Sequence, residues 1–344
     1  HYNFNISSII AIAPTVDQYK PTNKSITLKD VNYLVIHGAN DQDVYQFSGL
    51  KQYKNIQYTG EGEYIKTALY CAGCNHGQFN SRWGLYDREG LYRKALNVKN
   101  FVSENEQQRI AEIFIKVFLD CTLKERKEHI KLLEDCNLYK AYLPETLYIQ
   151  CYQTSDFIPL CDFEEDINLQ SGTMEDVNIE VVGGDIWTEG IYPSEVPNSN
   201  SAMYLAWSQH KLPTVTIYTP DINLLERNLQ FDVMDLRENF SEEDIYIQDV
   251  QIVVEDQEGN SARVSLRDYA TLYPALMVRL NKLQYLLGKV EYKHQFQTVT
   301  IPAYELVSRH AQMTGGTIDI THIRKIKFTF YGESGKVAFD QIGY

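Results

Sequence analysis

The first third of the chain contains short apolar segments, each of which ends abruptly in polar residues. Residues 7–14, 31–37 and 64–71 are runs of this kind, with little alternation between apolar and polar positions. A strand that is buried on both faces of a parallel sheet has this pattern, because other elements cover both of its sides. We therefore expect three parallel strands here, each followed by a polar loop.

Residues 103–123 predict a long amphipathic helix after these strands. Ser103 and Glu106 have the spacing of a capping box, in which each side chain bonds the other residue's backbone N–H. Apolar residues then recur at steps of three and four: Ile110, Phe114, Val117, Phe118 and Cys121. A shorter helix is expected within 44–53, with Asp43 as its N-cap, and a charged helical stretch at 125–135.

From residue 144 onward the pattern changes to many short segments of β type. Turn sequences such as residues 256–260 and 332–335 separate several of them, and this density of strands predicts a β-sandwich or jelly roll. The expected strands are 146–154, 177–182, 203–208, 214–219, 229–236, 245–255, 262–266, 297–302, 323–331 and 336–342. Residues 274–287 have helical spacing, and we expect them to be an insertion that crosses the sandwich.

A length of 344 residues fits two domains. We expect residues 1–143 to be the C-terminal part of a doubly wound α/β sheet and residues 144–344 to be an all-β sandwich. With 46 acidic and 32 basic residues, the net charge of −14 argues against nucleic acid as a partner. No apolar run approaches the roughly 20 residues of a membrane span. The chain begins with His1 rather than methionine, so the natural N-terminus is expected further upstream.

Six cysteines are too few for a disulfide scaffold, and one pair invites a metal interpretation. Cys71 and Cys74 form a C-x-x-C motif, and His76 follows two residues later. No second pair of ligands occurs at zinc spacing, so we interpret both cysteines as small buried residues below a strand end. We expect neither a metal nor a cofactor.

The residues that suggest chemistry are Asp41 and His76, which follow the second and third expected strands. Parallel strands present their carboxyl ends at one edge of a sheet, which would bring these two side chains together. In a catalytic triad, one histidine nitrogen takes a proton from the nucleophile while the other donates to a carboxylate. The alternative for His76 is a loop histidine that caps a turn. Asp17 is a rival to Asp41 as the acid, although we expect it to line a pocket or to close a turn.

Three segments resemble the C-terminal half of a bacterial α/β-hydrolase of the esterase, lipase and dienelactone-hydrolase type. They are residues 9–14, 37–44 (His-Gly-Ala-Asn-Asp-Gln-Asp-Val) and 75–80 (Asn-His-Gly-Gln-Phe-Asn). The resemblance implies that Asp41 and His76 are triad members. The family also uses a serine in Gly-x-Ser-x-Gly, a motif that this sequence does not contain. The nucleophile and oxyanion hole are therefore expected upstream, in a longer protein of which this chain is a fragment or processed piece; the alternative is a pseudoenzyme.

Further candidates concern the substrate. The expected pocket residues are Asp17, Phe79, Trp83 and Tyr86, although the aromatic ones could equally pack over the sheet edge. The β-rich half resembles a galactose-binding-like jelly roll, which implies glycan binding through exposed aromatic residues. Trp187 is the candidate contact, with packing against a neighbouring domain as its alternative. Trp207 lies in an apolar run and is expected in the core.

The sequence thus predicts ester hydrolysis through a serine, with His76 as general base and then acid and Asp41 orienting it. Its substrate would be a small or polymeric ester, and a peptidase of the same fold is a third hypothesis. The alternative from another class is a non-catalytic carbohydrate-binding protein whose hydrolase remnant is a scaffold. A secreted or periplasmic location follows from the resemblance.

Overall fold

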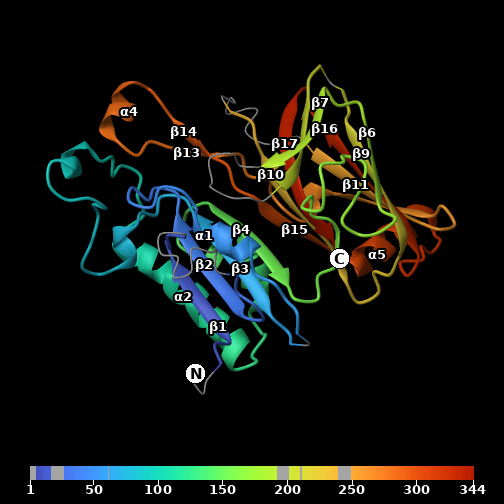
Figure 1. The fold of residues 1–344 in the computed structure, drawn as a ribbon, viewed down its shortest axis with the longest axis horizontal. Helices are drawn as coiled ribbons and strands as arrows, with labels where there is room; N and C mark the ends of the chain where they lie inside the picture. The colour runs from blue at the N-terminus through green and yellow to red at the C-terminus, as the bar shows by residue number, and fades with distance from the viewer. Residues whose placement is uncertain (1–4, 17–26, 61, 192–200, 210, 239–248) are drawn as a thin grey trace. The chain divides into compact units, whose positions relative to one another are not determined.

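The computed structural model describes residues 5–16, 27–60, 62–191, 201–209, 211–238 and 249–344 (Figure 1). The chain forms two units. The first comprises His1–Asp156, Pro193–Ser199 and Leu276–Gln295. The second comprises Phe157–Tyr192, Asn200–Ala275 and Phe296–Tyr344.

The first unit is built on a four-stranded sheet of order β1-β2-β3-β4. Strands β1 (Ser8–Ile12), β2 (Asn32–Gly38) and β3 (Ile65–Cys71) are parallel, so the three strands expected from the apolar runs are confirmed. Strand β4 (Tyr148–Thr154) pairs antiparallel with β3. Our assignment of residues 146–154 to the sandwich was therefore wrong, because a strand's apolar pattern does not reveal which sheet it joins.

Helices cover both faces of this sheet. Helix α2 (Glu104–Leu123) has the predicted capping box and packs the apolar face that includes Ile110 and Phe114 against β2 and β3 (Figure 1). On the other face, α1 (Gly49–Lys54) lies so close to β2 that a Cβ on Gly49 would be 2.6 Å from Val35. The N-cap of α1 is Ser48, so the prediction that Asp43 caps this helix was wrong.

Four short helical segments complete the N-terminal part of this unit: η1 (Gly77–Phe79), η2 (Tyr92–Ala95), α3 (Ile130–Glu134) and η3 (Cys136–Tyr142). The charged stretch 125–135 is thus helical only over α3. The buried residues of α2 and α3 pack with β2 and β3 into one apolar cluster that also contains Cys71 and Cys74. This core holds the carboxyl ends of β2 and β3 in place.

A segment from the second half of the sequence also belongs to the first unit. It consists of β13 (Leu276–Val278), α4 (Lys282–Leu286) and β14 (Glu291–Lys293), with β13 and β14 antiparallel. We call Leu276–Gln295 the arm. Its backbone bonds Asn97, whose N–H donates to Leu280 O at 3.0 Å and whose side chain donates to Arg279 O at 2.7 Å. The predicted insertion across the sandwich was wrong, since the segment is mainly a two-stranded arm and is assigned to the first unit.

The second unit is a β-sandwich of two antiparallel sheets. One has the order β15-β10-β17-β8-β7, with β5 also pairing with β17, and the other has the order β12-β11-β16-β9-β6. The strands of the first sheet are β5 (Pro159–Cys161), β7 (Ile186–Ile191), β8 (Ser201–Trp207), β10 (Asn228–Asp235), β15 (Gln297–Pro302) and β17 (Gly335–Gly343). Those of the second are β6 (Asn178–Val182), β9 (Thr214–Ile222), β11 (Asp249–Asp256), β12 (Ser261–Ser265) and β16 (Ile323–Tyr331).

Aromatic rings fill the interior between these two sheets. Phe231 and Phe339 of the first sheet contact Phe328 and Phe330 of the second, with ring centroids 5.1–5.4 Å apart across the interface. Trp207 is 3% exposed in the same core, as predicted. Two helical segments were not predicted: η4 (Leu266–Asp268) and α5 (Ala303–Thr314), which ends at Gly315 in the left-handed conformation.

Candidate functional site

Asp41 lies in the loop that follows β2, and this loop holds its carboxylate in one orientation. The Oδ1 atom accepts hydrogen bonds from the backbone N–H groups of Asp43 at 2.9 Å and Val44 at 2.6 Å. The residue is 0% exposed. An ionised carboxylate that is out of solvent is stable only when donors of this kind surround it. The loop therefore presents Oδ2 in a defined direction.

The loop after β3 presents His76, and helix α2 fixes the residue before it. Gln107 donates from Nε2 to Asn75 O at 2.7 Å, and its Oε1 accepts from Asn75 N at 3.0 Å. Both residues are 0% exposed. These two hydrogen bonds satisfy the backbone N–H and C=O of Asn75. Left buried without partners, both groups would be unfavourable. It anchors the turn from which His76 projects.

The two loops come close together because Gly38 has no side chain. A Cβ at this position would lie 2.3 Å from Cys74 O, a distance that real Cβ atoms do not reach. The close approach lets Asn40 N donate to Cys74 O at 2.9 Å, while Asn40 Oδ1 accepts from Gly73 N at 2.9 Å. The glycine in the His-Gly segment is thus explained by the contact between the loops.

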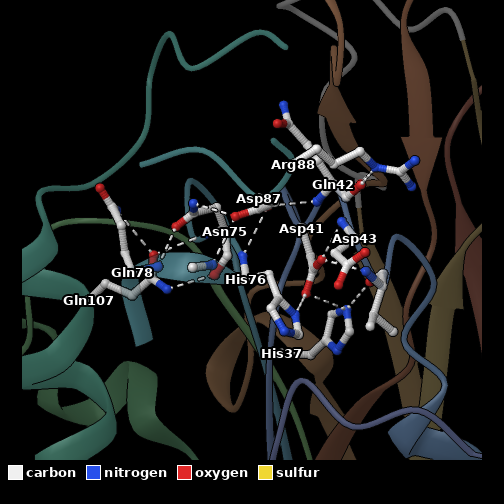
Figure 2. A network of polar contacts seen from close by, with 12 residues as sticks. His37, Asp41, Gln42, Asp43, Asn75, His76, Gln78, Asp87, Arg88 and Gln107 are labelled. Carbon is white, nitrogen blue, oxygen red and sulfur yellow. Dashed lines mark hydrogen bonds and ion pairs between the residues drawn. The ribbon is translucent and has the colours of Figure 1, made fainter. Parts of the chain in front are cut away.

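Asp41 and His76 meet at this contact (Figure 2). The Nδ1 atom of His76 donates to Asp41 Oδ2 at 2.9 Å, and the imidazole is 18% exposed. This hydrogen bond raises the pKa of His76 above its ordinary value, burial opposes the rise, and the charges of Asp41, Asp43 and Asp87 add to it. With Nδ1 protonated toward Asp41, neutral His76 carries its lone pair on Nε2. The arrangement can accept a proton at Nε2 and stabilise the resulting imidazolium.

A second carboxylate, Asp87, lies behind this pair and accepts four hydrogen bonds. Its Oδ2 accepts from Gln42 N at 2.8 Å and His76 N at 3.2 Å. Its Oδ1 accepts from Gly77 N at 2.8 Å and Asn75 Nδ2 at 2.7 Å. Burial raises the pKa of Asp87, and the N–H groups of Gln42, Gly77 and His76 lower it. Asp87 thus contacts both loops of the site.

His37, at the end of β2, is a buried neighbour of Asp41. Its Nε2 donates to Val44 O at 2.8 Å and lies 3.9 Å from Asp41 Oδ2. The ring packs against both Phe47 and Tyr70, with centroid distances of 5.2 and 5.9 Å. Burial lowers the pKa of His37, so the imidazole is neutral at neutral pH. Through Val44, His37 supports the loop that follows β2 (residues 39–48), which we call the acid loop.

A pocket of about 550 Å³ adjoins His76. It is lined by the end of β1 and the residues after it, by the acid loop, and by His76 and Trp83. The lining residues are Ile12, Ala13, Thr15, Val16, Asp43, Val44, Tyr45, Gln46, Ser48, His76 and Trp83. The Trp83 ring lies parallel to the imidazole of His76, with centroids 5.7 Å apart, and is 63% exposed. The pocket therefore has both aromatic and polar walls.

The structure separates the predicted site residues into those that gather and those that do not. Asp41, His76 and Trp83 come together at or beside this pocket. Phe79 instead packs against the apolar core under α2, and Tyr86 lies below the guanidinium of Arg93 at 4.3 Å. Two candidates remain: Asp17 lies outside the described residues, and half-buried Trp187 packs against the sandwich core.

Three polar residues of the site were missed. Asp87 follows no motif. Gln42 donates from Nε2 to Asn97 O at 2.8 Å and to Leu280 O of the arm at 2.6 Å, a contact across 238 positions of sequence. Gln107 carried a usable signal, because it is a polar residue three positions before Ile110 on the apolar stripe of a predicted helix. A buried glutamine at this position needs hydrogen-bond partners. Gln107 finds them in the backbone of Asn75, in the loop that follows β3 and carries His76, which we call the histidine loop.

Within the described ranges, no three His, Cys, Asp or Glu side chains lie close enough to hold a metal ion. All six cysteines, Cys71 and Cys74 among them, are buried and form no disulfide. Of the helices in the described part of the chain, none has the length and apolar composition of a membrane crossing.

Searches against known proteins match only at the level of three-dimensional structure. No family model and no curated protein matches the chain. A family 11 carbohydrate-binding module of a cellulosomal cellulase of Clostridium thermocellum aligns with 54% of this chain and 92% of its own, at 15% identity and a TM-score of 0.33. An exo-β-agarase aligns with 54% of this chain and 24% of its own, at 15% identity and a TM-score of 0.32.

A family 29 carbohydrate-binding module complexed with mannohexaose aligns with 55% of this chain and 91% of its own, at 11% identity and a TM-score of 0.29. The assignment of the second unit as a β-sandwich rests on its sheet topology. The comparisons do not support the α/β-hydrolase resemblance of the first unit.

Proposed function

We propose that the first unit is the acid–histidine part of a serine-hydrolase-type site that cleaves an ester. The observation that carries the proposal is the 2.9 Å bond from His76 Nδ1 to Asp41 Oδ2, at the carboxyl ends of two adjacent parallel strands. It leaves Nε2 as the basic nitrogen of a histidine that lines a pocket. A histidine held in this way takes the proton of a serine hydroxyl and then returns it to the leaving group.

The proposal requires a serine and oxyanion donors that the Gly-x-Ser-x-Gly motif would supply, and this sequence lacks that motif. Among the described strands, β1 pairs only with β2. Its other edge can therefore accept a further strand. The residues after β1 line the pocket together with His76. A serine at the carboxyl end of a strand beside β1 would border the same pocket, so we place the nucleophile on such a strand, supplied by a longer protein.

The test is labelling by a fluorophosphonate probe, measured as intact mass. We expect the longest polypeptide that the gene encodes to take up one probe, and the His76→Ala variant of it to lose the labelling. The 344-residue chain alone should take up none. A longer product that stays unlabelled would overturn the proposal. Labelling of the shorter chain would place the nucleophile within it, and Ser48, which lines the pocket, would be the first residue to replace.

Ester and peptide cleavage share this chemistry, so a second assay separates them. A nitrophenyl ester and the matching nitroanilide present the same acyl group with leaving groups of different basicity. We propose that the ester is the substrate, as the resemblance of residues 37–44 and 75–80 to esterases implies. Equal turnover of the anilide would instead indicate a peptidase.

We infer a second activity, glycan binding by the sandwich, from the solvent face of the sheet β12-β11-β16-β9-β6. Tyr218 of β9 is 40% exposed there, and its hydroxyl donates to Glu180 at 3.0 Å. Lys325 lies 5.8 Å from the ring of Tyr218, and Tyr331 donates to Gln251 at 3.1 Å. Aromatic rings with neighbouring donors and acceptors can hold a sugar by stacking and hydrogen bonding together.

Glycan binding is tested by calorimetry against a panel of soluble plant and algal oligosaccharides. Tyr218→Ala should weaken binding at least tenfold. Tyr304→Ala is the matched control, because Tyr304 is 70% exposed and belongs to helix α5 rather than to a strand of that sheet. An equal effect of both variants, or no binding by the parent chain, would count against a site on this face.

A further inference from the structure

The four hydrogen bonds of Asp87 have a consequence for the Asp41–His76 pair. Gln42 N belongs to the residue after Asp41, and His76 N belongs to the histidine itself; both donate to the same oxygen, Oδ2 of Asp87. The other oxygen holds Gly77 N and the side chain of Asn75, on either side of His76. One carboxylate therefore bonds the backbone of both loops at the positions where the pair forms (Figure 2).

Other contacts connect the two loops further from the pair. The bond from Asn40 N to Cys74 O lies one residue before Asp41 and two before His76, and Gln107 bonds only the histidine loop. Both oxygens of Asp87 accept hydrogen bonds from N–H groups, which is the bonding pattern of an ionised carboxylate, and bonds to an ionised acceptor are roughly twice as strong as neutral ones. The contact through Asp87 is therefore a strong link between the loops at the pair itself.

We propose that Asp87 is a positioning residue that sets the distance and angle between Asp41 and His76. Its meaning for catalysis rests on the function proposed above, whereas the geometric part applies to this chain as it is. Asp87 touches neither the pocket nor the imidazole through its side chain, so it acts through the backbone of Gln42 and His76.

Asparagine cannot replace Asp87 in this role although it has almost the same shape. An amide has one acceptor oxygen and one NH₂ group. In either orientation the NH₂ would face two N–H donors, namely those of Gln42 and His76 or those of Gly77 and Asn75. Two of the four bonds are lost and two donors are brought together. The loops should then separate at the pair.

The test measures His76 in the 344-residue chain by nuclear magnetic resonance, through its imidazole pKa and the low-field proton on Nδ1. Loss of that proton signal in His76→Gln assigns it. We expect Asp87→Asn to weaken the proton affinity of His76 about tenfold and to broaden or abolish the Nδ1 proton. Circular dichroism and a thermal melt check that the variant is folded.

Asp43→Asn is the matched control, because both substitutions remove one negative charge near His76. The charge of Asp43 acts on the pKa of His76 more strongly than that of Asp87, and the side chain of Asp43 accepts none of the four bonds. If charge alone acts, the pKa of His76 should fall more in Asp43→Asn than in Asp87→Asn. The proposal predicts the opposite order, and it predicts that Asp43→Asn retains the Nδ1 proton signal.

The proposal would be overturned if Asp87→Asn lowered the pKa of His76 no more than Asp43→Asn does and kept the Nδ1 proton signal. If Asp87→Asn does not fold, Asn75→Ala removes one of the four donors and should give a smaller change in the same direction; an unchanged His76 would again count against it. Failure of the proposed function shows differently, because it would leave the longer product unlabelled by the fluorophosphonate while the effect of Asp87→Asn on His76 persists in the 344-residue chain.

Discussion

Two interiors of this protein have different compositions. Between the sheets of the sandwich, phenylalanine rings such as Phe328 and Phe339 meet face to edge or at a tilt. At the ends of β2 and β3 the buried groups are polar: Asp41, Asn75 and Gln107 are all 0% exposed. The first interior is stabilised by removing apolar area from water, and the second only by satisfying each polar group with a partner.

The difference shows where a role beyond folding is to be sought. Any side chain of suitable size and polarity can fill an apolar interior, whereas a buried polar network is unfavourable unless nearly every member is bonded. Asp41 has three bonds and Asp87 four. Two carboxylates bonded this fully around one partly exposed histidine are better explained by chemistry than by stability.

The largest expected effect concerns the pair itself. In a longer product that labels with fluorophosphonate, Asp41→Asn should slow turnover by about 10⁴, because histidine then adopts the wrong tautomer, as in other triads. The measurement is initial rate on an activated ester. Glu89→Gln, a change at an exposed residue outside the site, is the control. A loss below tenfold would make the network a structural feature only.

Phe339→Ala tests the apolar interior. It removes a ring that contacts Phe231, Phe328 and Phe330 in a core that cannot fully collapse. We expect the free energy of unfolding to fall by about 3–5 kcal/mol, measured by urea denaturation. A loss near 1 kcal/mol would mean that this interior is not closely packed.

Gln107→Leu sharpens the contrast between the two interiors. Leucine fills similar volume but leaves both backbone groups of Asn75 unpaired, so we expect a loss of about 2 kcal/mol or more. Phe339→Leu places leucine in the apolar interior instead. It should reduce the free energy of unfolding less than Phe339→Ala does. Equal tolerance of leucine at the two sites would remove the distinction drawn here.

The smallest expected effect is a pH dependence with opposite signs at two histidines. Folding raises the pKa of His76, so its contribution to stability is complete below the unfolded value of about 6.5 and is lost as pH rises through the folded pKa. Folding lowers the pKa of His37, so stability falls as pH drops below about 6.5 toward its folded pKa.

Urea denaturation over this pH range in two variants separates these contributions. His76→Gln should remove the decline above about pH 6.5, and His37→Gln should remove the decline below it. Curves of unchanged shape would contradict the environments described for the two rings.

Much of the fold could be predicted because its signals are local. The capping box of Ser103 and Glu106 and the stripe behind it define α2 within one residue. Segments 297–302 and 323–331 coincide with β15 and β16, since strand patterns depend only on neighbouring residues. Asp41 and His76 were found because each directly follows a recognisable strand.

The unpredicted features depend on contacts between distant residues. Nothing near Asp87 in sequence indicates that Gln42 N, 45 positions earlier, needs an acceptor. Strand β4 looks like any sandwich strand, and only its pairing with β3 places it in the first sheet. The place of the arm could not be predicted either, because the residues it bonds, Gln42 and Asn97, lie far away in the sequence.

The bond between Gln42 and Leu280 also bears on how the protein is made. The amide of Gln42 is synthesised together with the candidate acid, yet its acceptor is synthesised 238 residues later. The sheet of β1, β2 and β3 can form early, but the loop that holds Asp41 gains this partner only after the arm has been made. Ribosome-bound chains that end before the arm should therefore expose this loop to protease, and those that include it should protect it.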